Sequence, residues 1–173
     1  MTKFLRMASL VATVTGLAIT ATPAMAVTAT TDADARVEIL KGLTLSSSQN
    51  LDLGTVVLSG SGTWTGAIVA IDRDGNFDCD GGSSTKVTCS GSPVEASYDV
   101  TGSAGYDVDI ASGTVTLTNT NGDTLDLTPD HDATVTLDST GAYTFGVGGS
   151  VSVDYNTPDG VYTGTFAVTA DYQ

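Results

Sequence analysis

The sequence predicts an all-β fold, a single domain built as a sandwich or a barrel. Three observations support this prediction. Short segments in which apolar and polar residues alternate recur along the whole chain. Turn residues, chiefly Gly, Asn, Asp and Pro, separate these segments. No segment sustains the 3.6-residue apolar period of an amphipathic helix.

The first 26 residues have the three parts of a secretory signal peptide. Lys3 and Arg6 make the start positive, and residues 7–21 are mostly apolar and uncharged. Ala24-Met25-Ala26 matches an A-x-A cleavage site, so we expect the mature chain to begin at Val27. The apolar run is too short for a spanning helix, and no second run follows. We therefore expect an exported protein of the periplasm, cell surface or extracellular space, with no membrane span in the mature chain.

The mature chain, residues 27–173, has the size of one domain with one hydrophobic core. The first 26 residues hold two of the six basic residues and none of the twenty acidic ones, so the mature net charge is −16. A chain this acidic repels nucleic acid and anionic membrane surfaces. We therefore expect no nucleic-acid partner.

Residues 27–39 alternate between small or apolar side chains at odd positions and polar or charged ones at even positions. The pattern predicts a strand, and two interpretations remain open. It is either the first strand of the chain's own sandwich or an N-terminal arm that acts as donor strand for a neighbouring subunit. The candidate interface residues of this segment are Val27, Ala29, Val37 and Ile39.

Twelve strands are expected, separated by turns of recognisable chemistry. Asn121-Gly122 predicts a two-residue hairpin, and Pro158-Asp159-Gly160 predicts the turn before the last strand. The glycines of residues 146–149 predict a bulge or a tight bend between two strands. The expected strands span residues 35–40, 51–58, 64–71, 85–89, 94–101, 105–111, 114–119, 123–127, 133–137, 142–147, 150–155 and 161–172.

The last expected strand, residues 161–172, carries its large side chains on one face. We expect this face to lie in the core. An unpaired edge beside the strand would be an aggregation hazard, so we expect another strand to cover it. The candidate interface residues here are Gly160, Tyr162, Phe166, Val168 and Tyr172.

Cys79 and Cys89 are the only cysteines in the chain. Export to an oxidising compartment favours a disulfide between them. In the chain-entropy account, closing a loop of this size stabilises the fold by about 3 kcal/mol.

An acidic stretch surrounds Cys79, with oxygen-bearing side chains at alternate positions, the rhythm of a calcium loop. The EF-hand pattern fails, because Phe77 stands where Gly is required and Ser83 where Glu is required. A solvated hairpin tip and a weak calcium site both remain open, and calcium is the only cofactor that the sequence suggests. The candidate ligands are Asp72, Asp74, Asn76, Asp78 and Asp80.

The sequence lacks a recognisable catalytic constellation, so we expect no enzymatic activity. His131 is the only histidine and lies in a turn-like acidic stretch, and no G-x-S-x-G motif is present. Trp64, the only tryptophan, is expected to pack in or near the core rather than to bind sugar.

Several stretches together carry a family resemblance: ARVEILKGLTLSSSQNLDLGTV near the start, VEASYDVTG in the middle, and TFGVGGSVSV with DGVYTGTFAVTADYQ at the end. They resemble the bacterial exported domain-of-unknown-function family 4402 over almost the whole mature chain. Tyr172, second from the end, and Gly160, fourteenth from the end, also resemble the C-terminal signature of chaperone–usher pilins. In those proteins the last strand borders a groove that another strand fills.

The resemblance implies a pilin-like or adhesin-like β-sandwich, often from Gram-negative bacteria, and no activity. We therefore expect a Greek-key-type sandwich, pilin-like or immunoglobulin-like. The expected function is that of a non-enzymatic exported surface or fimbrial-type structural protein, a pilin-like subunit or an adhesin. Its partners would be copies of itself or a periplasmic chaperone. The alternative is a self-contained periplasmic or secreted binding module that binds calcium weakly.

Overall fold

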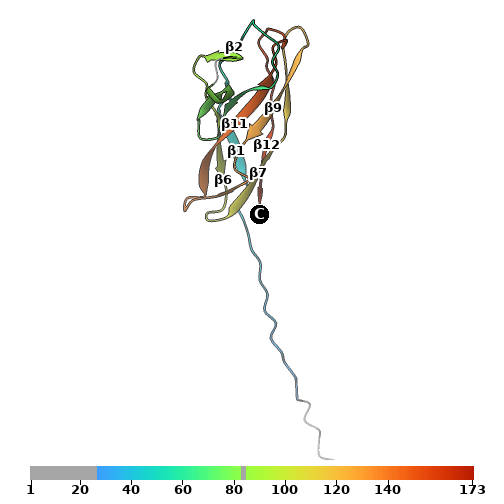
Figure 1. Cartoon of the computed structure of the whole chain (residues 1–173). Coiled ribbons are helices and arrows are strands. Elements are labelled where there is room, and N and C mark those ends of the chain that lie inside the picture. Colours follow the sequence, from blue (N-terminus) through green and yellow to red (C-terminus); the bar gives the residue numbers. More distant parts are fainter. Residues whose placement is uncertain (1–26, 83–84) are drawn as a thin grey trace, which may run out of the picture. The chain divides into compact units, whose positions relative to one another are not determined.

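The computed structural model describes residues 27–82 and 85–173, so the expected signal peptide, residues 1–26, lies outside the described residues. The folded domain comprises Glu38–Gln173 and is all-β, which confirms the predicted class (Figure 1). A 3-10 turn at Asp80–Gly82 is the only helical element within the described ranges. The strands are β1 (Thr44–Gln49), β2 (Thr55–Leu58), β3 (Ala67–Ile71), β4 (Phe77–Cys79), β5 (Val87–Ser90), β6 (Ala96–Thr101), β7 (Asp107–Ser112), β8 (Val115–Thr118), β9 (Thr124–Asp130), β10 (Thr134–Thr136), β11 (Ala142–Val153) and β12 (Val168–Tyr172).

The long strand β11 organises the domain. Its first half, residues 142–147, pairs with β6, and its second half pairs with β3 and with β9. The resulting curled sheet has the order β1-β6-β11-β3-β4, with β9 joined to β11 and β8 to β9. Two smaller sheets complete the fold, one with the order β10-β7-β12 and one formed by β2 and β5.

Two hydrophobic clusters lie against the same face of β11. Around its first half, Phe145 and Val147 pack with Val108 of β7 and Leu137, which follows β10. Around its second half, Val151 and Val153 pack with residues of β3, β5 and β9. Because side chains alternate along a strand, the odd-numbered residues of β11 supply both clusters. The sheet β10-β7-β12 therefore covers one half of β11, and the pair β2-β5 covers the other.

The chain enters the sheet later than the sequence predicts. Residues 27–43 contain no strand, so the strand expected at residues 35–40 is absent, and residues 27–39 do not form a first strand of the domain's own sheet. Most side chains before Ala35 are small or acidic, so pairing them would bury too little apolar surface to offset the entropy of ordering the chain. The first strand is instead β1, a Ser-rich segment that the sequence does not predict and that Leu45 anchors in the core.

The glycine-rich part of β11 is a continuous strand, so the predicted division into separate strands at residues 142–147 and 150–155 is wrong. A Cβ on Gly146 would collide with the backbone of Arg73, and one on Gly148 with the backbone of Ile71 and Asp72. These glycines therefore leave room for the chain that follows β3 to cross close over β11. Close backbone approach explains why residues 146 and 148 are glycines.

The hairpin predicted at Asn121-Gly122 forms between β8 and β9, but its loop is longer than predicted. The amide of Gly122 donates to the carbonyl of Asn119, and the amide of Asn119 donates to the carbonyl of Asp123. Gly122 has a φ of 89°, in the left-handed region. The connection is therefore a three-residue loop in which the glycine forms the bulge after the turn.

Candidate interaction site

The last strand is shorter than predicted, and only part of its predicted inner face packs against the core. β12 pairs with β7 in antiparallel register, from Val168 opposite Ser112 to Tyr172 opposite Val108. Phe166, Val168 and Tyr172 pack against the core cluster around the first half of β11. These three side chains are half-buried, on the face predicted to lie in the core.

Gly160 and Tyr162 lie, like Phe166, outside β12. Gly160 packs against the side chain of Asn119 and has a φ of 149°. Tyr162 donates a hydrogen bond of 2.8 Å to the carbonyl of Pro158 in the preceding turn. Between Tyr162 and β12, an isolated bridge joins Thr163 to Thr118 of β8. Residues 161–167 therefore form no continuous strand, and the chain passes from the edge of β8 to the edge of β7.

The outer edge of β12 is open. Among the described residues, β12 pairs with β7 alone, at one end of the order β10-β7-β12. The amide of Gln173 donates to the carbonyl of Asp107, which sets the alternation of the ladder. Thr169 and Asp171 thus direct their backbone groups toward β7, whereas Val168 and Ala170 direct theirs away from it. The open edge offers a row of backbone donors and acceptors to another strand.

Tyr172 ties the end of β12 to the beginning of the domain. Its hydroxyl donates to the carbonyl of Lys41 at 2.8 Å and accepts from the amide of Ser103 at 2.6 Å. The amide of Lys41 in turn donates to the Ser103 hydroxyl at 2.8 Å. No sequence pattern marks Ser103 and Lys41, because only the fold brings the entry of β1, the β6–β7 turn and the C-terminus together.

Residues 27–37 of the arm belong to a unit separate from the domain. Its candidate interface residues Val27 and Val37 are 88% and 80% exposed, and Ala29 is exposed as well. Ile39, just inside the domain boundary, is 85% exposed. Large exposed apolar side chains at alternate positions are typical of a segment that pairs with a partner.

The acidic stretch is organised by its own backbone. Asp72 accepts hydrogen bonds from the amides of Asp74 and Asn76 and from the side-chain amide of Asn76. The hydrogen bonds from Asn76 lower the pKa of the Asp72 carboxyl below its usual range. Asp78 accepts from the amide of Gly81, and Asp80 lies 3.7 Å from the Lys86 ammonium. The carboxylates thus face different partners.

Of the candidate calcium ligands, Asn76 contacts Asp72, whereas Asp78 and Asp80 have other partners. In the part of the chain that the structure describes, no group of three or more His, Cys, Asp or Glu side chains is placed to hold a metal ion. Cys79 and Cys89 form the predicted disulfide. It joins β4 of the large sheet to β5 of the two-stranded sheet. The described part of this stretch therefore has the geometry of a cross-linked turn.

A second charged cluster surrounds Arg73. Its guanidinium contacts Asp130 at 3.3 Å and Asp132 at 2.9 Å, and its amide donates to Asp130 at 3.1 Å. The neighbouring His131 directs Nδ1 to the carbonyl oxygen of Asp132 at 2.8 Å. These contacts fasten the loop after β3 to the end of β9.

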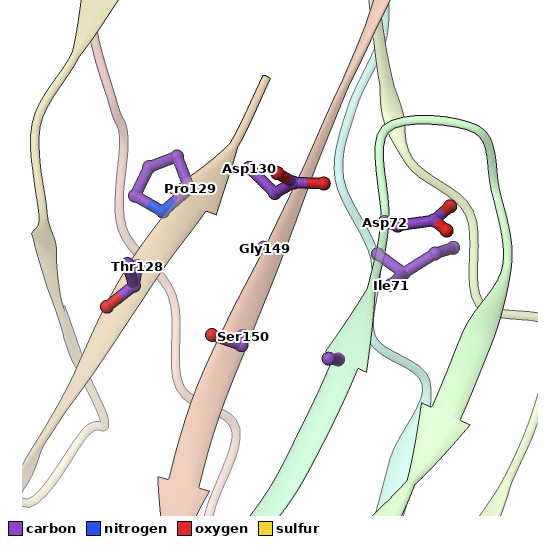
Figure 2. A pocket seen from close by; sticks show the side chains of 8 residues that line it. Ile71, Asp72, Thr128, Pro129, Asp130, Gly149 and Ser150 are labelled. Carbon is purple, nitrogen blue, oxygen red and sulfur yellow. The ribbon is translucent and has the colours of Figure 1, made fainter. Parts of the chain in front are cut away.

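An open hollow of about 340 Å³ lies beside this cluster, over the middle of β11. In Figure 2 the Asp130 side chain points from β9 across β11 toward β3, and the small side chain of Ser150 lies on β11 below it. Asp72 and Asp130 both line the hollow, and both carboxylates already accept the hydrogen bonds described above. Ser150 and Thr128 contribute the hydroxyls of its lining, and Ala70, Ile71 and Pro129 contribute apolar surface.

Within the described ranges, no helix has the length and apolar character needed to cross a membrane. The profile of one protein family, described as Domain of unknown function (DUF4402), matches residues 43–172. No curated protein and no solved structure shows significant similarity to the chain.

Proposed function

We propose, from the premise that this chain belongs to the DUF4402 family, that it is a non-enzymatic exported structural protein that associates by strand addition. It would serve at the cell surface as a pilin-like subunit or an adhesin, with a Greek-key-type sandwich of pilin-like or immunoglobulin-like kind. Its partners would be other copies of itself or a periplasmic chaperone. The expected signal peptide, residues 1–26, supports export, and the resemblance supports a Gram-negative origin.

The observation that carries this proposal is the open edge of β12. The strand lies at the end of its sheet, with backbone groups of Val168 and Ala170 directed away from β7. Most proteins blunt or cover such an edge, because it pairs readily with another extended segment. β12 contains one charged residue, Asp171, and no proline. The edge therefore supports a role in pairing.

The occupant that we propose is the arm of a second copy, extended through Ile39. Val37 and Ile39 lie on one side of this segment and are its largest apolar side chains beside Val27. In strand addition, main-chain hydrogen bonds provide affinity, and alternate side chains set the register. The small residues Ala29, Thr31 and Ala33 contribute little contact, so we expect Val37 and Ile39 to dominate the affinity.

Light scattering on protein eluting from a size-exclusion column tests the proposal. The protein should show a molar mass that rises with concentration, and removal of residues 27–34 should weaken this rise. Replacing Val37 and Ile39 together by Ser should abolish it. Thr28→Ala with Thr30→Ala, on the other side of the arm, is the matched control and should leave association unchanged. A full chain that stays monomeric at every concentration, also when a periplasmic chaperone is added, would contradict the proposal.

The alternative, a self-contained binding module, draws support from the acidic stretch that precedes the disulfide. Calorimetry with Ca²⁺ on the wild type and on Asp74→Ala tests it. Because Asp72, Asp78 and Asp80 have different partners, we expect binding that is absent or near millimolar, as in weak extracellular modules. Micromolar binding that Asp74→Ala abolishes would favour the alternative.

A further inference from the structure

Tyr106 and Tyr172 lie side by side and hold the segment 38–41, where the chain enters the domain. Tyr172 and Ser103 bind both the carbonyl and the amide of Lys41, as described above. Tyr106 reaches the same segment further back, because its hydroxyl donates to the Glu38 carboxylate. The entry segment contains no strand, and these contacts fix it by side chains instead.

The corner is packed as well as hydrogen-bonded. The rings of Tyr106 and Tyr172 meet edge to face, with centroids 5.9 Å apart and planes at 75°. Gly102 lies against the Tyr172 hydroxyl, and a Cβ there would collide with that hydroxyl and crowd Leu43 and Leu137. Edge-to-face rings add to the stability of such a contact beyond the area that they bury. The observed position of the Tyr172 side chain thus requires glycine at residue 102.

We propose that Tyr172, Tyr106 and Ser103 form a clasp that fixes the point at which the arm leaves the domain. Through the clasp, residues 38–43 stay fixed only while β12 is packed in the domain, because Tyr172 belongs to that strand. Pairing of another strand with the open edge of β12 would steady Tyr172 and thereby the clasp. Its use in assembly rests on the proposed function, since a fixed exit point would present the arm to a neighbouring copy.

Limited digestion with trypsin reports the clasp directly. After the expected signal peptide, the chain contains four trypsin sites: Arg36 in the arm, Lys41 in the clasp, and Arg73 and Lys86 in the domain. Cleavage after Lys41 requires residues 38–43 to leave their hydrogen bonds and enter the protease. We therefore expect the purified protein to be cut after Arg36 well before Lys41, since proteolysis follows local opening.

Tyr172→Phe keeps the ring and removes the hydroxyl that Lys41 and Ser103 share. Its loss should raise the rate of cleavage after Lys41 on the order of tenfold, the factor that two modest hydrogen bonds provide. Tyr143→Phe, an exposed tyrosine of β11, is the matched control and should leave the rate unchanged. An unchanged rate in Tyr172→Phe would overturn the proposal.

If a substitution destabilised the whole domain, cleavage after Lys86 would become faster together with cleavage after Lys41. If Tyr172→Phe behaves in this way, Ser103→Ala decides, because it removes only the acceptor of the Lys41 amide. This variant should speed cleavage after Lys41 several-fold and leave Lys86 unaffected, and no change would overturn the clasp. The digestion is done on dilute monomer, so it is independent of self-association. Arm variants that fail to alter association would refute the proposed function and leave the clasp standing.

Discussion

At the scale of single residues, the turns of this protein depend on a few polar side chains that replace missing backbone partners. Asn119 is the clearest case, since it is 5% exposed and fully hydrogen-bonded. Its side-chain oxygen accepts from the amides of Asn121 and Asp123, and its side-chain nitrogen donates to the Asp123 carboxylate at 2.9 Å. The same nitrogen reaches the carbonyl of Asp159 at 3.4 Å. One side chain thus closes the β8–β9 loop and holds the turn before residue 161.

Asn119→Ala should therefore destabilise the protein by about 2–4 kcal/mol, because it leaves two backbone amides without their acceptor and opens a cavity. Urea unfolding monitored by circular dichroism measures the change in the free energy of unfolding. Thr120→Ala, an exposed position in the same loop, is the control and should change stability by less than about 0.5 kcal/mol. A loss in Asn119→Ala as small as in the control would contradict this account of the loop.

Two aspartates give the protein a defined sensitivity to acid. The amide of Ala142 and the hydroxyl of Thr140 lower the pKa of Asp138, and hydrogen bonds from Asn76 lower that of Asp72. A carboxyl with a depressed pKa in the folded state stabilises the fold above its unfolded pKa of about 3.8 and loses this effect as the pH falls through its folded value. Stability should therefore fall as the pH is lowered below about 4. Asp138→Asn does not titrate, so its unfolding free energy should depend less on pH over this range, and an unchanged slope would contradict the assignment.

At the scale of elements, the solvent face of the sheets is built from paired strands that carry threonine opposite aspartate. Thr134 donates to Asp109, Thr136 to Asp107 and Thr144 to Asp99, at 2.6–2.9 Å. Such cross-strand pairs stabilise a sheet modestly and give each carboxylate a hydrogen-bond donor. These pairs explain how the polar face of the strands can carry many aspartates and still favour the β conformation, because the threonines opposite them are good strand formers. The alternation of apolar and polar residues therefore predicts these strands.

The sequence predicts the strands well where one face is buried. It predicts them poorly where the close approach of another backbone segment determines the residue type. The alternation locates β3, β6, β7 and β12, because the apolar positions of each strand point into one of the two hydrophobic clusters. It misses β1, whose serines carry no alternation, and it breaks β11 in two, because glycines there serve a crossing chain. At the candidate site, the inner face of β12 is predictable. The clasp is not, since it joins residues more than sixty positions apart.

The crossing over β11 makes a sharp prediction. Gly148→Ala should destabilise the protein by at least about 2 kcal/mol, because its Cβ has no space beneath the backbone of Ile71 and Asp72. Gly113→Ala is the matched control, since a Cβ there meets nothing within 4 Å. Thermal unfolding of the two variants tests the contrast. Equal melting temperatures would show that the loop after β3 moves aside at no cost.

The disulfide is the other device that acts between elements. Cys79→Ser with Cys89→Ser should lower the free energy of unfolding by about 3 kcal/mol, because the cross-link limits the unfolded chain. The loss should be the same after reduction of the wild type, which is the internal control. Two free thiols in the unreduced protein, measured by mass spectrometry, would contradict the bond itself.

At the scale of the whole molecule, the proposed association joins two strongly acidic surfaces. The net charge of −16 expected for the mature chain opposes self-association at low ionic strength, so the contact must come from backbone pairing and from apolar side chains. Salt at about 0.15 M shortens the range of this repulsion to roughly 8 Å. Association that strengthens with salt would fit strand addition between acidic partners. Self-association should therefore be measured at this salt concentration.

Amide hydrogen exchange along β12, followed by NMR at a low and a high protein concentration, tests the central claim most directly. On association, the amides of Val168 and Ala170, which face the open edge, should exchange about tenfold more slowly or better. The amides of Thr169 and Asp171, already directed toward β7, should change little. This alternation is the signature of a strand added at this edge. Association without added protection of Val168 and Ala170, or with protection confined to β1, would contradict the account.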